Sequence, residues 1–236
     1  MTARLAFGLS RRCFLCVGAG VCGAALVHAA EPGVSGAEIV IGQNITLQGG
    51  KNRYGVAALD GIKLYLDAVN AAGGVHGRKL VLRTQDDDNT AAAAEANARK
   101  LLAEGAFVLF ASQEGGPSTA VAKVAEELRV PFFGPMAGSP NLRRPHSPMV
   151  FPVRAEHKDE FRALMEWGQR TGLKTVGFFM SDSGVGRAHL ENVKFAAAEF
   201  GMNVMLPMPF KGDVSDAQLD ELDAALGQLR QVVLHG

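Results

Sequence analysis

One short segment of the sequence carries residues suited to holding a small anion. Residues 111–119 read Ala-Ser-Gln-Glu-Gly-Gly-Pro-Ser-Thr, between an apolar run and a helical pattern. A glycine-rich turn that opens a helix leaves main-chain N–H groups free and a partial positive charge, both of which favour an anion. Ser118 and Thr119 add hydroxyl donors, although either hydroxyl would also serve as a simple helix cap. The segment is therefore the first candidate for a ligand site.

Other polar groupings indicate structure rather than catalysis. The acidic run 86–88 lacks the distributed oxygen ligands and terminal Glu of a calcium loop, so we expect it to end a strand and lead into a helix cap. Asp88, Asn89 and Thr90 are the candidates for that N-cap. There is no phosphate-binding loop and no nucleophile-elbow motif. No zinc-ligand spacing occurs among the internal histidines, which are His76, His146, His157 and His189. We therefore expect no metal, no cofactor and no enzymatic activity.

The first 30 residues have the features of an export signal. A basic start is followed by an apolar stretch at 14–27, which is too short for a permanent membrane anchor, and by small residues at 29–30. Residues 10–15 resemble the twin-arginine signal, with an ordinary secretory signal as the alternative. All three cysteines lie in this segment, so the mature chain would have none. We expect cleavage near Ala29–Glu31, a periplasmic location and no membrane insertion afterwards.

The charge of the chain argues against nucleic-acid binding. The 236 residues contain 24 basic and 24 acidic side chains, and no basic cluster follows the export segment. A nucleic-acid partner would require such a basic surface. The length is sufficient for one large domain or two small ones.

From residue 38 onward, strand-like runs alternate with helical periodicity. Helices are indicated by apolar residues at helical spacing, one of them at His157–Arg170. This alternation predicts parallel sheets with helices on both faces, in an α/β fold. A stretch rich in Gly, Pro and Ser at 134–156 separates two lobes, residues 36–153 and residues 154–236. Strands are expected at 38–47, 79–84, 106–111, 130–133, 149–153, 175–180, 203–206 and 231–234.

The expected topology locates a binding site. Ligands of open parallel sheets bind at the carboxyl ends of strands where the strand order reverses, which in a flavodoxin-like order lies between the first and third strands. The loops at that point are 47–54 and 111–118, and both are rich in glycine, so their main chain can approach a ligand closely.

Several motifs in fixed order resemble the leucine/isoleucine/valine-binding family of type 1 periplasmic binding proteins. The resemblance extends from about residue 36 to the end. It implies a two-lobe fold whose second lobe is incomplete, because relatives continue further and return to complete the first lobe. The motifs are Asp67-x-x-Asn70-x-x-Gly73-Gly74-Val75-x-Gly77-x-x-Leu80, Asp86-Asp87, Pro131-Phe132-Phe133-Gly134-Pro135, and Val176-Gly177-Phe178-Phe179 with Gly186-Arg187.

The resemblance implies a receptor that is not catalytic. Such a protein binds an amino acid or a related small polar solute between its lobes and delivers it to the permease subunits of an ABC transporter. The alternatives are a sensory or regulatory domain of the same fold and a secreted flavodoxin-like enzyme. The export segment and the missing catalytic motifs argue against them.

The resemblance also implies positions for the ligand contacts. Tyr54 would flank the ligand, and a group in the third-strand loop would surround its carboxylate: Gln113, Glu114, Gly116, Ser118 and Thr119. Main-chain contacts would come from Met136, Ala137 and Gly138. The second lobe would add Asp182, Val185 and His235.

Two of these assignments have simpler alternatives. Glu114 would pair with a ligand ammonium group or, as we favour, be a solvated loop carboxylate. His235 would be an exposed residue near the end of the chain rather than a ligand contact.

Overall fold

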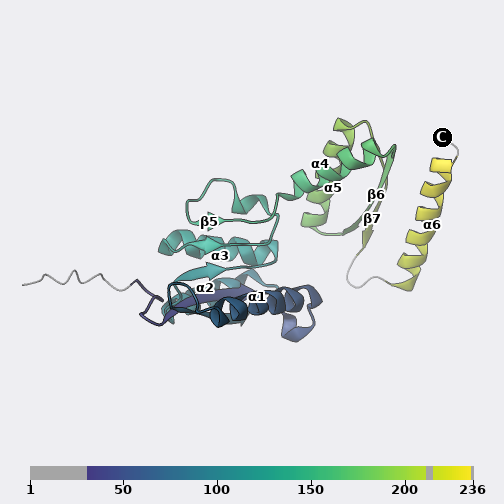
Figure 1. The fold of residues 1–236 in the computed structure, drawn as a ribbon. Helices are drawn as coiled ribbons and strands as arrows, with labels where there is room; N and C mark the ends of the chain where they lie inside the picture. Colours follow the sequence, from purple (N-terminus) through teal and green to yellow (C-terminus); the bar gives the residue numbers. More distant parts are fainter. Residues whose placement is uncertain (1–30, 211–214, 235–236) are drawn as a thin grey trace, which may run out of the picture. The chain divides into compact units, whose positions relative to one another are not determined.

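The chain forms two separate parallel sheets. A computed structural model describes residues 31–210 and 215–234, and the predicted export segment lies outside them. The first sheet has five strands in the order β2-β1-β3-β4-β5, all parallel. Its strands are β1 (Glu38–Ile45), β2 (Lys79–Asp86), β3 (Val108–Phe110), β4 (Phe132–Phe133) and β5 (Val150–Phe151). Figure 1 shows the helices that lie beside this sheet. The predicted α/β class and the adjacency of the first and third strands are confirmed.

Helices cover both faces of the first sheet. They are α1 (Arg53–Ala71), α2 (Ala91–Ala103) and α3 (Gly115–Leu128), with short 3-10 turns η1 (Gln48–Gly50) and η2 (Pro140–Leu142). The buried core joins α2 and α3 to one face through Leu109, Phe132 and Val150. The β1–α1–β2 and β2–α2–β3 connections run in opposite directions, so right-handed crossovers place α1 on the other face.

Local chemistry explains where the helices begin and end. The side chain of Asn52 caps α1 by accepting a hydrogen bond from the N–H of Gly55 at 2.8 Å, and Thr90 caps α2 in the same manner. After α1, Gly73 and Gly74 adopt positive φ angles of 102° and 73°, which turn the chain toward β2. The predicted stop at this glycine pair is therefore confirmed.

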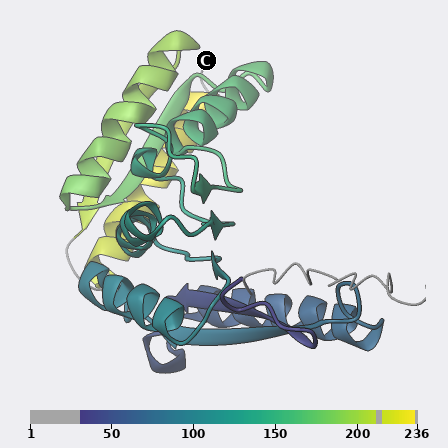
Figure 2. The same cartoon turned by 90° about the vertical axis from the view of Figure 1, so that its left-hand side faces the viewer.

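The second sheet pairs β6 (Thr175–Ser181) with β7 (Asn203–Phe210) in parallel. Helices α4 (His157–Arg170) and α5 (Gly184–Glu199) lie beside these strands, as Figure 2 shows. Their shared core consists of Met165, Ala196, Ala197 and Met202. Within residues 31–210 and 215–234, no helix combines the length and apolar character needed to cross a membrane.

The strand expected at 231–234 is wrong, because helix α6 (Asp216–Leu234) continues through it. A short apolar run is compatible with a strand or a buried helical turn, and periodicity alone does not separate them. No glycine or proline interrupts residues 228–234, so nothing in the sequence ends the preceding helix. In the described residues the second sheet has two strands instead of the three expected.

Candidate ligand-binding site

The carboxylate of Asp86 organises the loop that follows β1. One carboxylate oxygen accepts hydrogen bonds from the N–H groups of Leu47 and Gln48 at 2.9 and 3.1 Å, and the other accepts from Gly49 at 2.9 Å. Burial alone would raise the pKa of Asp86, but these bonds and one from Asp88 together lower it. Asp86 is thus an anion that holds the glycine-rich loop in a fixed shape.

The neighbouring Asp87 is buried and joins β1 to the start of α2. It accepts hydrogen bonds from Asn44 at 2.7 Å, from the Thr46 hydroxyl at 2.6 Å and from the N–H of Asn89 at 3.0 Å. Burial raises the pKa of Asp87, and these bonds offset part of that effect. The acidic run ends a strand as expected, and of the three cap candidates it is Thr90, not the acid Asp88, that caps α2. In the described residues, no cluster of three or more His, Cys, Asp or Glu is arranged to hold a metal.

The start of α1 packs tightly against the ends of β1 and β3. A Cβ atom on Gly55 would lie 1.9 Å from the carbonyl oxygen of Thr46 and 3.0 Å from Oε1 of Gln113. Only glycine allows this approach. Tyr54, one residue earlier, remains 58% exposed at the carboxyl edge of the sheet.

The segment after β3 contains buried polar atoms whose hydrogen-bonding capacity is unmet. Within the described residues, Oγ of Ser112, Oε1 of Gln113 and Oγ of Ser118 are buried without a hydrogen-bond partner. Just before them, Ala111 has a positive φ of 51°, which is strained for a residue with a side chain. Unpaired buried polar groups cost roughly 1–3 kcal/mol each, and both features concentrate where proteins bind ligands. The sequence placed Ser112 in the candidate loop, but only Gln113 and Ser118 were singled out as ligand contacts.

The start of α3 differs from expectation in its capping. The N-cap residue is Glu114, and no side chain caps the helix. Ser118 lies one turn inside, and the Thr119 hydroxyl donates to the carbonyl of Gly115 at 2.7 Å. The capping role considered for Ser118 and Thr119 is therefore wrong. Gly116 lies exposed in the first turn of this 14-residue helix.

The loop after β4 lies beside the loop after β3. The N–H of Met136 donates to the carbonyl of Ser112 at 2.8 Å. Ala137 and Gly138 are buried, and the carbonyl of Ala137 accepts a bond from Arg143 at 3.4 Å. The structure thus brings together the predicted positions from the first lobe at one edge of the sheet.

A cation that the sequence did not reveal also belongs to this region. Arg154 makes two hydrogen bonds to Glu160, at 2.6 and 3.0 Å, and these are the largest cause of its raised pKa. Tyr54 and Glu114 lie close enough to add smaller contributions in the same direction. Glu114 also accepts a bond from Gln113 at 3.3 Å, so it is a partnered group rather than simply a solvated one.

The predicted residues of the second lobe lie at the carboxyl end of β6. Asp182 accepts a hydrogen bond from Arg187 at 2.7 Å, and Val185 is 65% exposed in the first turn of α5. They occupy the same place on the second sheet, between a strand and a helix, that residues 111–119 occupy on the first. His235 lies outside the described residues.

This sheet order, with glycine-rich loops at its switch point, is typical of open α/β proteins, a class in which ligands bind at the carboxyl ends of the strands. The sequence model of the periplasmic binding protein family matches residues 38–225, and the chain belongs to this family.

Relatives and solved structures agree with this assignment. The chain is 26% identical over 210 residues to Leu/Ile/Val-binding protein homolog 7 of Brucella abortus, covering 85% of this chain and 52% of the relative. A benzoate-bound solute-binding protein of an ABC transporter from Rhodopseudomonas palustris shares the fold, with a TM-score of 0.67 and 20% identity over 82% of this chain and 53% of that one. A leucine-bound ABC transporter substrate-binding protein from Desulfitobacterium hafniense gives a TM-score of 0.63 and 18% identity, covering 81% and 56%. The chain spans about half the length of these proteins.

Proposed function

We propose that this chain is the solute-binding component of an ABC importer and that it binds a small carboxylate-bearing solute. The observation that carries the proposal is the group of unpaired buried atoms on Ser112, Gln113 and Ser118, beside the start of α3. Two hydroxyl donors and a helix N-terminus together suit a carboxylate. The remaining acceptor, Oε1 of Gln113, suits a donor group on the same solute.

The other predicted residues would complete the site. Tyr54 supplies an exposed aromatic wall, and Met136 to Gly138 supply a buried main-chain border. Glu114 and Arg154 place opposite charges nearby, which favours a solute with both an anionic and a polar or cationic group. Asp182 and Val185 would contact the solute from the second lobe.

The cellular setting is part of the same proposal. Residues 1–30 would direct export to the periplasm, and the lobes 36–153 and 154–236 would enclose a solute for transfer to permease subunits. An amino acid or an aromatic acid is the solute class that we favour, in line with the leucine and benzoate bound by the two structural neighbours.

Thermal unfolding with a solute panel tests the proposal. The panel contains the common amino acids, benzoate and 3,4-dihydroxybenzoate, with the uncharged amide benzamide as the control for benzoate. At about 100 times its Kd, a true solute adds about 2.7 kcal/mol of stability and raises the unfolding midpoint. The solute must be recovered chemically unchanged. Conversion of the solute, or no midpoint change with any carboxylate in the panel, contradicts the proposal.

A further inference from the structure

The first residue of α4, His157, is attached to the loop after β4 in two ways. Its N–H donates to the carbonyl of Gly138 at 3.1 Å. Its ring covers Gly138 so closely that a Cβ atom there would lie 2.6 Å from Nδ1 and 2.7 Å from Cε1. The imidazole therefore fills the space that a side chain at position 138 would need, and the two residues can move only together.

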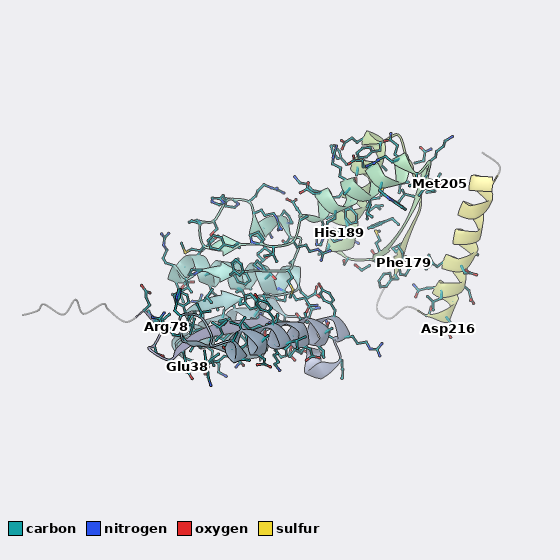
Figure 3. The ribbon with its side chains drawn as sticks, viewed as in Figure 1. Glu38, Arg78, Phe179, His189, Met205 and Asp216 are labelled. Atoms are coloured by element: carbon teal, nitrogen blue, oxygen red, sulfur yellow. The ribbon has the colours of Figure 1, made fainter. Side chains whose placement is uncertain are left out.

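A second histidine supports the first. His189, labelled on α5 in Figure 3, packs edge-on against His157 with 4.7 Å between ring centroids. Its other neighbour is Phe161, at 5.6 Å. Gly138, His157, His189 and Phe161 thus form a continuous row of contacts from the loop to the core side of the second sheet.

The surroundings of this row disfavour protonation of both histidines at the same time. Glu160 lies 3.2 Å from Nδ1 of His157, and the same carboxylate is bonded to Arg154. Burial lowers the pKa of His189, the charge of His157 lowers it further, and Glu160 opposes this in part. Two protons on the pair place like charges in direct ring contact, and the Glu160 carboxylate beside them is shared with Arg154.

Two other charged residues of this region, Glu156 and Arg143, have partners of their own. Glu156, the residue before it, forms a 2.6 Å ion pair with Arg144. Arg143 donates to the main-chain carbonyls of Ala137 and Ser139. The Glu156 carboxylate is therefore engaged with Arg144, and Arg143 is itself a cation that cannot neutralise a proton on the histidine pair.

We propose that His157 is a positioning residue of the solute site, and that the His157–His189 pair is a latch that releases the Met136–Gly138 loop when both rings are protonated. The latch rests on the proposed function only in that this loop belongs to the solute site. The pH-dependent release of the loop can be tested without any solute. In a binding protein it would make solute retention depend on pH.

Amide hydrogen exchange of the full chain, followed by NMR, tests the latch directly. The reporters are the N–H of His157, bonded to Gly138, and the N–H of Met136, bonded to Ser112; the control is Leu109, bonded to Pro131 in the sheet. Protection factors, corrected for intrinsic exchange, should fall about tenfold at both reporters between about pH 7 and about pH 5, and not at Leu109. Constant protection at both reporters while both imidazoles titrate overturns the latch.

Two variants separate the ring's shape from its charge. His157→Phe keeps an aromatic ring over Gly138 but cannot be protonated, so protection at Met136 should remain and lose its pH dependence. Gly138→Ala forces the ring away and should reduce protection at neutral pH, and adding His157→Ala should restore part of the loss because the clash is removed. Two results contradict the inference. One is strictly additive effects of Gly138→Ala and His157→Ala on amide protection, and the other is an unchanged pH dependence of protection at Met136 in His157→Phe. If the latch behaves as expected while no solute binds, the proposed function fails and the latch stands.

Discussion

An oxygen of the Asp86 carboxylate accepts a hydrogen bond from the main-chain N–H of Gly49 at 2.9 Å, across 37 positions of sequence. The bond joins the end of β2 to the loop that follows β1, its neighbour in the sheet. One side chain on a regular strand thus fixes the main chain of a loop at the switch point, where the solute is expected to bind.

Removing this carboxylate should destabilise the protein. Asp86→Ala leaves the N–H groups of Leu47, Gln48 and Gly49 without their acceptor, and we expect a loss of about 1–2 kcal/mol in the free energy of unfolding at neutral pH. Urea denaturation measures it. The control is Asp88→Asn, because the Asp88 side chain makes no hydrogen bond within the described residues and its positive φ of 47° suits asparagine.

The effect of Asp86 has a defined pH dependence. Its pKa is lower in the folded protein than in the unfolded chain, so its stabilisation is complete above the ordinary carboxylate pKa and is lost as pH falls through the folded value. Asp86→Ala should therefore lose less stability on acidification than the unaltered protein. If acidification lowers the free energy of unfolding equally in both proteins, Asp86 does not hold the loop as an anion.

The close approach of α1 to the sheet gives a second prediction. Gly55→Ala places a Cβ 1.9 Å from the carbonyl oxygen of Thr46 and should cost about 1–3 kcal/mol of unfolding free energy. Gly61→Ala, in the same helix with no atom within 4 Å of the new Cβ, should instead stabilise by about 0.5–1 kcal/mol. Chemical denaturation of both variants checks the contrast, and equal effects would show that α1 does not pack as described.

The buried hydroxyl groups predict a conflict between stability and binding. Ser118→Ala and Ser112→Ala each remove a buried hydroxyl that has no partner among the described residues, so the solute-free protein should be equally stable or more stable by up to about 1 kcal/mol. Solute affinity should fall by about 0.5–1.5 kcal/mol for each change, and by more if the bonded group is charged. Calorimetry with the solute found in the panel measures affinity. Loss of stability with unchanged affinity would assign these hydroxyls a structural role.

Two tyrosines on α1 offer a matched pair. Tyr54 and Tyr65 are both exposed, at 58% and 71%, but of the two only Tyr54 lies close enough to Arg154 at the carboxyl edge to affect its pKa. Tyr54→Ala should weaken solute binding by more than the serine changes because an aromatic wall is lost, while Tyr65→Ala should leave it unchanged. Calorimetric titrations of both variants against the same solute decide this. Equal losses would move the site away from the first turn of α1.

Sequence patterns predicted the regular elements better than the site. Periodicity defined α4 as His157–Arg170, the range that the structure shows. It failed at 231–234 because an apolar run without a helix-breaking residue fits either conformation. Local patterns are informative when the neighbours that decide a conformation are close in sequence.

The missed site residues depend on neighbours that only the fold supplies. Ser112 is an ordinary serine until its hydroxyl is buried without a partner. Arg154 becomes relevant only when β5 brings it near Tyr54 and Glu114, which are 100 and 40 positions away in sequence. The sequence places Asp86 at the end of a strand. Its role in holding the loop of the adjacent strand depends on a contact that only the fold creates.

We propose that a carboxylate-bearing solute binds at the carboxyl edge of the first sheet. The most direct measurement is an NMR titration of the ¹⁵N-labelled chain with the panel solute that raises the unfolding midpoint. We predict that the largest, saturable shifts occur at the amides of Gly115, Gly116, Ser118 and Met136, and that Leu109 in the sheet core and Tyr65 on α1 are little affected. Saturable shifts that cluster elsewhere and leave the first turn of α3 unchanged would contradict the account.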